Sequence, residues 1–459
     1  MIAPARVAAY EILTAVSKGR DLPAAIASAR RGLRDDRDRA LAAEIATGVQ
    51  RWRSALDHAI AACADRPIDR LDPQIREILR LSAYQLLHLT RVPASAVVDD
   101  AVNLARRAGK RSAAGFVNAV LRKLSRRRSA LPLPPRPADP TDRDAVLAYF
   151  SIALSHPRWL AARWYERLGF DAAETWLRFN NQPAPITLRA NRIRTTPEAL
   201  ADRLASTGIR VRRGEFAPDA LVVEEGNPLR LAAGGRGGGS DDGAFVVQDE
   251  ASQLVALLAS PRPGMRLLDA CAAPGGKTSA MAAAMDRQGM LVACDVRRRR
   301  IELLRKTIVS TGADNVRIVQ ADLSRPPPFL TPFDTVVVDA PCSGLGTLRR
   351  DPDIRWRRQE SDLTAFAAAE LIMLQRAADA VAPGGRLVYA TCSSEPEENE
   401  GVVAAFLAST PGFTGLHARA AAPQLPEAVI DERGHLRTEP HTHGLEAFFG
   451  AVFERILGP

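Results

Sequence analysis

Residues 265–279, MRLLDACAAPGGKTS, join an apolar run ending in Asp269 to a Pro-Gly-Gly turn and then to a sequence that favours a helix. This order predicts a strand, a tight loop and a helix start, with the main-chain N–H groups of Lys277 and Thr278 exposed to a ligand. The segment has neither the G-x-G-x-x-G spacing of a dinucleotide site nor the G-x-x-x-x-G that precedes a Walker lysine. An adenosyl compound is therefore the ligand we expect, although an ordinary strand-to-helix turn fits this segment alone equally well.

The sequence after Ala251 alternates short apolar runs with helical segments. The apolar runs lie at 265–271, 290–296, 316–322, 333–341 and 385–392, and the helical segments lie near 276–286, 297–311, 362–382 and 397–408. Strands that alternate with helices predict a mostly parallel sheet covered on both faces, and the run at 447–457 would add a late edge strand. We therefore expect residues 251–459 to form a Rossmann-like α/β catalytic domain.

The composition limits the class of protein. A chain of 459 residues exceeds what one core usually supports, so two or three domains are expected. Hydrophobic residues make up 46% and charged residues 25%, and no apolar run approaches the roughly eighteen residues of a membrane span. The apolar N-terminal stretch contains Tyr10 and Glu11 and lacks a convincing cleavage site, so we predict a cytoplasmic protein without a signal peptide.

The cysteines are odd in number and widely scattered, and their spacing is not that of metal ligands. This pattern indicates reduced thiols, so we expect neither disulfides nor a bound metal. A catalytic thiol is therefore permitted. The five positions are Cys63, Cys271, Cys294, Cys342 and Cys392.

Residues 1–130 have apolar residues three and four apart throughout, which predicts an all-α domain of six or seven helices. The region resembles the RNA-binding fold of the antitermination factor NusB, through LRLSAYQLLHLTRVPASAVVDDAVNLAR at 79–106 and FVNAVLRKL at 116–124. It holds 24 Lys and Arg against 13 Asp and Glu, a net charge of +11, whereas the rest of the chain has a net charge of −2. This excess favours a nucleic acid partner over an arginine-rich composition without one.

The basic domain is followed by a linker and a small subdomain. Five prolines at 129–140 preclude regular structure, so residues 131–183 are expected to be a proline-rich linker and a helical connector. Short strands and one helix at 184–250 predict a small α+β RNA-binding subdomain, whose glycine run at 234–243 is expected to be a flexible loop. At the end of the basic domain, a cluster of cations is expected to contact RNA phosphates, namely Arg122, Lys123, Arg126, Arg127 and Arg128.

Each predicted strand of the α/β domain ends in an acid or a thiol. Ligands of such sheets bind beyond the carboxyl ends of the strands, so these side chains should converge, although single aspartates often cap helices or lie on the surface. Asp295, after the second strand, can accept hydrogen bonds from both ribose hydroxyls of an adenosyl ligand, and Asp322 can reach the adenine edge. The residues at the strand ends are Asp269, Asp295, Asp322, Asp339 and Cys392.

Two cysteines stand at neighbouring strand ends, Cys342 in DAPCSGLGTLRRDPDIRW and Cys392 in YATCSSEPEENE. A buried cysteine is often only a small apolar side chain, but C5 of a pyrimidine becomes nucleophilic when a thiolate adds at C6. After methyl transfer the C5 proton must leave and the thiol be expelled, and a second thiol can assist. Asp339 is placed to stabilise the activated ring at N3 or N4. Spacing alone does not decide which thiol attacks, because DNA cytosine methyltransferases use the cysteine of a Pro-Cys segment.

The segments DACAAPGGKTS, VVDAPCSGLGTLRRDPDIRW and YATCSSEPEENE resemble the signature segments of RNA cytosine-C5 methyltransferases. Together with LRAN, VQDEAS and the NusB-like region, they make essentially the whole chain similar to the RsmB family of small-subunit rRNA methyltransferases, also called Sun or Fmu. This resemblance implies S-adenosylmethionine as methyl donor, Cys392 as nucleophile and Cys342 as the thiol that helps release the product.

The resemblance also implies binding residues and a substrate. The substrate would be a 16S rRNA cytosine, by resemblance the one numbered 967, and Arg189 and Asn191 would contact RNA. A transfer-RNA cytosine is the nearest alternative, and a non-catalytic RNA-binding or antitermination factor is another; neither a membrane nor a protein partner is expected. The methyl donor would be bound by Cys271, Ala272, Ala273, Pro274, Gly275, Gly276, Lys277, Asp295, Asp322 and Asp339.

Overall fold

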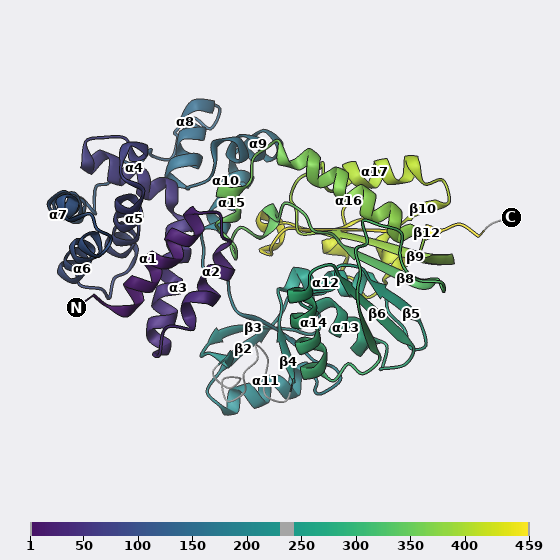
Figure 1. Cartoon of the computed structure of the whole chain (residues 1–459). Coiled ribbons are helices and arrows are strands. Elements are labelled where there is room, and N and C mark those ends of the chain that lie inside the picture. Colours follow the sequence, from purple (N-terminus) through teal and green to yellow (C-terminus); the bar gives the residue numbers. More distant parts are fainter. Residues whose placement is uncertain (1, 230–242, 458–459) are drawn as a thin grey trace. The chain divides into compact units, whose positions relative to one another are not determined.

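The computed structural model describes residues 2–229 and 243–457, and the chain divides into two compact units (Figure 1). One unit comprises Met1–Pro183 with Leu348–Glu360, and the other comprises Ala184–Thr347 with Ser361–Pro459. The glycine run at 234–243, expected to be a flexible loop, lies outside the described residues except for Gly243.

The first unit is built from helices in the part of the chain that the structure describes. The predicted NusB-like, all-α domain is confirmed as α1 to α7, whose apolar faces form one buried core. Helix α5 shows how the sequence sets a boundary: Asp72 accepts a hydrogen bond from the main-chain N–H of Gln74 (2.9 Å), and Pro73 occupies the first helical position. The helices are α1 (Pro4–Ser17), α2 (Leu22–Arg30), α3 (Asp36–Arg51), α4 (Arg53–Ala64), α5 (Pro73–His88), α6 (Ala94–Arg107), α7 (Ala114–Arg126), α8 (Arg143–Ala148), α9 (Arg158–Leu168), α10 (Phe170–Asn180) and α15 (Ile354–Arg357).

The segment Leu348–Glu360, which follows the Cys342 loop, packs within this helical unit. Arg355 on α15 is fully buried and donates hydrogen bonds to the carbonyl oxygen of Ser155 (3.0 Å) and to Oδ1 of Asn181 (3.0 Å). The indole N–H of Trp356 donates to the carbonyl oxygen of Gln50 (2.6 Å). These bonds anchor α15 to residues that lie more than 170 positions earlier in the chain.

The second unit begins with a small antiparallel sheet in the strand order β2-β3-β1-β4, as the predicted α+β subdomain requires. One helix, α11 (Pro197–Ser206), packs on this sheet, and its buried residues Leu200 and Leu204 join the core of the sheet. The strands are β1 (Thr187–Ala190), β2 (Arg210–Arg213), β3 (Ala220–Glu225) and β4 (Phe245–Val247).

The larger sheet of this unit has the strand order β10-β12-β9-β8-β5-β6-β7, with β11 paired to β12. Strands β5 to β9 are parallel to one another, as the alternating sequence pattern predicts, while β10, β11 and β12 are antiparallel additions. The strands are β5 (Arg266–Asp269), β6 (Met290–Asp295), β7 (Val316–Gln320), β8 (Phe333–Asp339), β9 (Val381–Thr391), β10 (Phe413–Leu416), β11 (Leu436–Thr438) and β12 (Phe448–Arg455).

Successive residues of these strands point into two different cores. Leu267 and Val337 join the core beneath α12, α13 and α14, whereas Leu268 and Val338 join the core beneath α16 and α17. Figure 1 shows the two groups of helices on opposite faces of the sheet. The helices of this unit are α12 (Glu250–Leu258), α13 (Gly276–Ala284), α14 (Arg298–Thr311), α16 (Asp362–Ala378), α17 (Glu400–Ser409), α18 (Ala418–Ala421) and α19 (Pro440–His443).

The prediction of an edge strand at 447–457 is wrong. Strand β12 pairs with β9 on one side and with β10 on the other, so it lies inside the sheet. Strand β10 has only four residues, FTGL, and two of them are polar or glycine, which explains why the sequence pattern does not reveal it.

Candidate active site

The loop between β5 and α13 lies at the carboxyl ends of the parallel strands. Gly275 has a φ of +104°, and a Cβ atom there would lie 2.9 Å from Cδ1 of Leu304, so this turn requires glycine. The N–H of Ala272 donates to the carbonyl oxygen of Cys294 (2.8 Å), which holds the loop against β6. The predicted order of strand, tight loop and helix start is therefore present at 265–279.

Asp269, at the end of β5, is buried beneath this loop. Its carboxylate accepts a hydrogen bond from the hydroxyl of Thr278 (2.7 Å). Burial is the main cause that raises the pKa of Asp269 to about 7. Asp269 therefore braces the start of α13 from within, and its side chain does not face an open site.

Asp295, at the end of β6, has a buried oxygen that fits a ribose hydroxyl. The residue is 3% exposed, and Oδ1 accepts a hydrogen bond from the N–H of Arg297 (3.2 Å). Among the described residues, Oδ2 has no hydrogen-bond partner, although Nε of Arg300 lies 3.3 Å away in an ion pair without hydrogen-bond geometry. A buried carboxylate oxygen that lacks a donor is costly, and a ligand hydroxyl would supply one.

Asp322 lies in the turn after β7 and is exposed. Oδ1 accepts hydrogen bonds from the N–H (3.0 Å) and the hydroxyl (2.6 Å) of Ser324, and these bonds lower the pKa of Asp322. Asp322 therefore stabilises its own turn, and its other oxygen, Oδ2, forms an ion pair with Nε of Arg325 (3.6 Å).

Lys277 and Asp339 form an ion pair between the β5–α13 loop and the end of β8. The distance from Nζ to Oδ2 is 2.6 Å, and the side chains are 13% and 27% exposed. Burial is the largest single influence and acts to lower the pKa of Lys277, but the charge of Asp339, its hydrogen bond and smaller contributions from Cys392 and Asp269 together raise the pKa. Lys277 also lies 5.5 Å from the centre of the Phe448 ring. The sequence places Lys277 in the donor-binding loop, and the structure turns its side chain toward Asp339.

The two cysteines meet at the ends of the neighbouring strands β8 and β9. Their Sγ atoms are 3.3 Å apart, and both side chains are partly exposed. The hydrogen bond to Cys392, together with burial, raises the pKa of the Cys342 thiol well above its usual value. In this pair Cys342 therefore keeps its proton and can donate its S–H to the sulfur of Cys392.

Arg189 and Asn191 do not have the surroundings expected of RNA-binding residues. Arg189 is 2% exposed and donates to Oε1 of Gln248 (2.7 Å) and to the hydroxyl of Ser279 (2.7 Å). Asn191 is 0% exposed and donates to the carbonyl oxygens of Gly243 (2.7 Å) and Thr311 (2.9 Å). The small sheet is thus joined to α13 and α14 by these side chains, and we correct their role from RNA contact to structural support.

The cationic cluster expected at the end of α7 lies in the helical unit. Arg126, Arg127 and Arg128 are exposed, and Arg122 is exposed with Nε bonded to Oδ1 of Asn118 (2.9 Å). Lys123 is half-buried and pairs with the carboxylate of Asp65 (2.8 Å), so part of its charge is already balanced. The three arginines are the members of the cluster whose surroundings suit a phosphate best.

Several residues beside the cysteines were missed by sequence reasoning, namely Ser343, Glu370, Tyr389, Ser393 and Glu398, all of them buried. The acidic run EPEENE after Cys392 contains Glu398, but it did not indicate a buried residue, because an acidic run usually indicates an exposed segment. Nothing in the sequence indicates that Glu370, within a helix, faces the same site.

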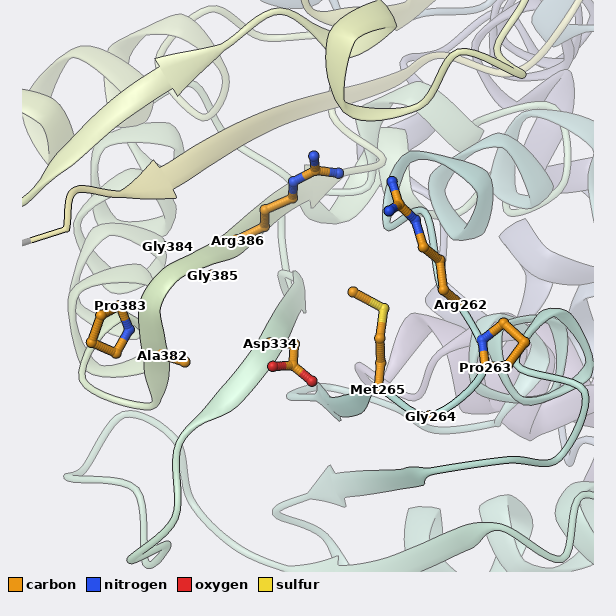
Figure 2. A pocket seen from close by; sticks show the side chains of 10 residues that line it. All are labelled: Arg262, Pro263, Gly264, Met265, Asp334, Ala382, Pro383, Gly384, Gly385 and Arg386. Carbon is orange, nitrogen blue, oxygen red and sulfur yellow. The ribbon is translucent and has the colours of Figure 1, made fainter.

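A pocket of about 630 Å³ lies away from these residues (Figure 2). It is lined by the residues before and at the start of β5 and β8 and by the first half of β9, including Asp334 and the two arginines Arg262 and Arg386. This is the amino edge of the parallel strands, opposite to the cysteines. The ligand of such sheets binds at the carboxyl edge, so the pocket is not the reaction site.

Two further observations concern ligands and membranes. In residues 2–229 and 243–457, no group of three or more His, Cys, Asp or Glu side chains is arranged to hold a metal ion. Within the same residues, every helix falls short of the length and apolar character needed to cross a bilayer.

Comparison with known proteins matches three stretches of the chain to described families. Residues 256–454 match the family described as 16S rRNA methyltransferase RsmB/F, residues 3–126 match the NusB family, and residues 156–230 match the ferredoxin-like domain of RsmF/B-like methyltransferases.

Individual relatives match along most of the chain. The probable ribosomal RNA small subunit methyltransferase B of Bacillus subtilis is 33% identical over 90% of this chain and 90% of its own length. The ribosomal RNA small subunit methyltransferase B of Pseudomonas putida is 34% identical over 94% of this chain and 96% of its own length. The crystal structure of PH0851 is 25% identical, with a TM-score of 0.80 over 99% of both chains. The chain therefore belongs to the RsmB/F family of S-adenosylmethionine-dependent rRNA methyltransferases.

Proposed function

We propose that this methyltransferase acts at C5 of a cytosine in 16S rRNA through a covalent bond between Cys392 and C6 of the base. The observation that carries the proposal is the pair of sulfur atoms 3.3 Å apart at the carboxyl edge of the sheet. Addition at C6 needs one thiolate and release needs a group beside it, and the pair supplies both. The ion pair of Lys277 and Asp339 belongs to the same site, because Cys392 contributes to raising the pKa of Lys277.

In the first step the sulfur of Cys392 forms a bond to C6, and the C5–C6 double bond shifts its electrons toward C5 and the ring nitrogen N3. The pKa of the Cys342 thiol is raised, so its S–H can donate a hydrogen bond to the sulfur of Cys392 during this step. Asp339 holds the N3/N4 edge of the cytosine, and the hydrogen bond from Lys277 orients the Asp339 carboxylate.

S-Adenosylmethionine, when bound, supplies a methyl group on a positively charged sulfur. The residues that fit it are the loop 271–277, whose turn at Gly275 packs tightly against Leu304, and Asp295, whose buried Oδ2 lacks a donor among the described residues. Asp322 stands at the same edge and is the candidate for the adenine.

The last step restores the base. The proton at C5 passes to water, its bonding electrons re-form the C5–C6 double bond, and the bond between C6 and sulfur breaks, so that Cys392 leaves as a thiolate. The S–H of Cys342 stabilises the departing sulfur, because a charge-assisted hydrogen bond is stronger than a neutral one. This is the role in product release that we assign to Cys342.

For the chain as a whole we propose four functional segments. The RNA-binding segment is 1–130, and residues 131–183 connect it to the rest of the chain. The small subdomain that supports the donor loop is 184–250, and the segment that catalyses the reaction, in the cytoplasm, is 251–459. Arg126, Arg127 and Arg128 would contact phosphate, so neutralising all three should weaken RNA binding and make its dependence on salt shallower, since fewer counterions are released. Filter binding across a salt series measures how RNA affinity depends on salt. Equal slopes for mutant and parent would show that the three arginines do not contact phosphate.

The substrate is tested by mapping 5-methylcytosine in the RNA of a deletion strain. One cytosine of 16S rRNA should lose its methyl group, and the wild-type copy, but not Cys392→Ala, should restore it. Loss of methylation at a transfer-RNA cytosine instead would transfer the proposal to that substrate. Unchanged methylation everywhere would contradict a catalytic role and favour an RNA-binding factor.

A further inference from the structure

A buried carboxylate ties together the two loops that carry the cysteines. Glu398 is 0% exposed and accepts hydrogen bonds from the main-chain N–H (2.6 Å) and the hydroxyl (2.6 Å) of Ser343. It also accepts a hydrogen bond from the hydroxyl of Ser393. Ser343 directly follows Cys342, and Ser393 directly follows Cys392. One carboxyl group therefore holds the neighbours of both thiols.

The main chain of Glu398 is itself fixed. The hydroxyl of Tyr389 on β9 lies 2.5 Å from the carbonyl oxygen of Glu398 and 2.9 Å from Oε2 of Glu370 on α16. A carbonyl oxygen can only accept, so the single hydroxyl proton of Tyr389 goes to Glu398, and the contact with Glu370 needs a proton from Glu370. Burial, followed by the charge of Glu398, raises the pKa of Glu370 to about 10, so Glu370 carries that proton at pH 7.

A main-chain contact joins the same two loops at a second point. The N–H of Gly346 donates to the carbonyl oxygen of Cys392 (2.9 Å). A Cβ atom at position 346 would lie 2.7 Å from that oxygen and 2.2 Å from the carbonyl oxygen of Ala447, so the approach requires glycine. This contact lies four residues beyond Cys342, whereas the bonds of Glu398 act at the residue next to it.

We propose that Glu398 is a positioning residue that sets the separation of the Cys342 and Cys392 sulfur atoms. A carboxylate suits this task because its two oxygens accept three hydrogen bonds at once, whereas an amide accepts on only one atom. The consequence for product release rests on the proposed two-thiol reaction. The role of Glu398 in setting the distance between the two sulfur atoms does not depend on that reaction. Misplacing a reacting group by 1 Å can cost about 10²-fold in rate, so a loosened pair should release product slowly.

Two variants and one control test the proposal. Glu398→Gln keeps the shape of the side chain and the acceptor for the Ser343 N–H but loses the charge. Ser393→Ala removes one of the three donors without altering Glu398, so it remains informative if Glu398→Gln folds poorly. Glu400→Gln is the control, because its carboxylate pairs with Arg437 in the same stretch of chain and does not contact the serines.

The first measurement is independent of RNA and of methyl transfer. With oxidised glutathione, one cysteine forms a mixed disulfide, and the second cysteine displaces glutathione; two protein thiols are oxidised and one oxidised glutathione becomes two reduced molecules. The rate of the second step reports how close the sulfur atoms are held, and peptide mapping identifies the Cys342–Cys392 bond. We expect this step to be about tenfold slower in Glu398→Gln and slowed to a lesser degree in Ser393→Ala, with no change in Glu400→Gln.

The second measurement is the covalent complex with RNA. Glu398→Gln should bind S-adenosylmethionine with unchanged affinity, because the Glu398 carboxylate accepts its hydrogen bonds from Ser343 and Ser393, which lie outside the loop 271–277. It should, however, accumulate the protein–RNA adduct that the wild type resolves. An unchanged rate of disulfide closure in folded Glu398→Gln and Ser393→Ala would overturn the positioning role. If disulfide closure is slower in the Glu398 and Ser393 variants but no variant, including Cys342→Ala, accumulates a protein–RNA adduct, the positioning role of Glu398 stands. That result would contradict the two-thiol reaction instead.

Discussion

The ammonium group of Lys277 lies 2.6 Å from Oδ2 of Asp339, so the loop that we propose to bind the methyl donor is joined to the acid that we place at the cytosine. Both side chains are largely buried. A buried ion pair is screened less by water and salt than an ion pair at the surface. The hydrogen bond from Lys277 therefore orients the carboxylate of Asp339 before the base arrives.

Lys277→Met should remove this support while preserving the length of the side chain and the main-chain N–H. We expect the rate of methylation to fall by about 10²-fold, the scale of one positioned acid–base group, with the affinity for S-adenosylmethionine changed only slightly. Single-turnover kinetics and calorimetry separate the two effects. Lys306→Met, at an exposed position of α14, is the control. Loss of donor binding at an unchanged chemical rate would show that Lys277 acts on the donor instead.

Asp295→Ala should weaken binding of S-adenosylmethionine by about 1.5–3 kcal/mol, the scale of hydrogen bonds to a charged group. The reason is that Oδ2 of Asp295 is buried and has no donor among the described residues. Calorimetry measures the loss, and Asp314→Ala, which removes an exposed carboxylate paired with Arg287, is the matched control. Equal donor affinity in folded Asp295→Ala and in the parent would contradict the assignment.

Glu370→Gln should stabilise the protein increasingly as the pH rises. The pKa of Glu370 is about 10 in the folded chain, because of burial and the charge of Glu398, and about 4.3 in an unfolded chain. Between pH 5 and 9 the unfolded state loses this proton and the folded state keeps it. The contribution of Glu370 to the free energy of unfolding therefore falls by about 1.4 kcal/mol for each pH unit.

Glutamine carries no such proton, so the difference in Tm between Glu370→Gln and the parent should grow from pH 5 to pH 9. Glu427→Gln serves as control, since its carboxylate is 85% exposed and pairs with Arg419 at the surface. A difference in Tm that stays constant over this range would mean that Glu370 is ionised in the folded protein.

The sequence predicted the parts of the fold that depend on local patterns. Strands β5 to β9 were foreseen because short apolar runs alternate with helical segments, and Cys342 and Cys392 were expected at neighbouring strand ends. Features that depend on pairing between distant segments were not foreseen. Strand β12 was expected at an edge, because nothing in FTGL indicated that β10 would cover it.

The same limit applies to the side chains. Arg189 and Asn191 occur in a recognisable motif, but the motif does not reveal that both are buried and bonded to α13, α14 and their neighbours. Arg355 was part of a catalytic signature segment, yet it is buried among residues of the helical unit. Glu398 lies in an acidic run, and such a run usually predicts an exposed segment. Burial of a charged residue depends on partners elsewhere in the chain, which periodicity does not identify.

Comparison of Cys392→Ala with Cys342→Ala tests whether one thiol begins the reaction and the other ends it. Each variant is incubated with RNA and S-adenosylmethionine and run on a denaturing gel with and without ribonuclease. Cys392→Ala should form no adduct, and Cys342→Ala should accumulate a slowly migrating, ribonuclease-sensitive band of protein bound covalently to RNA. A band with Cys392→Ala and none with Cys342→Ala would contradict these roles and exchange them.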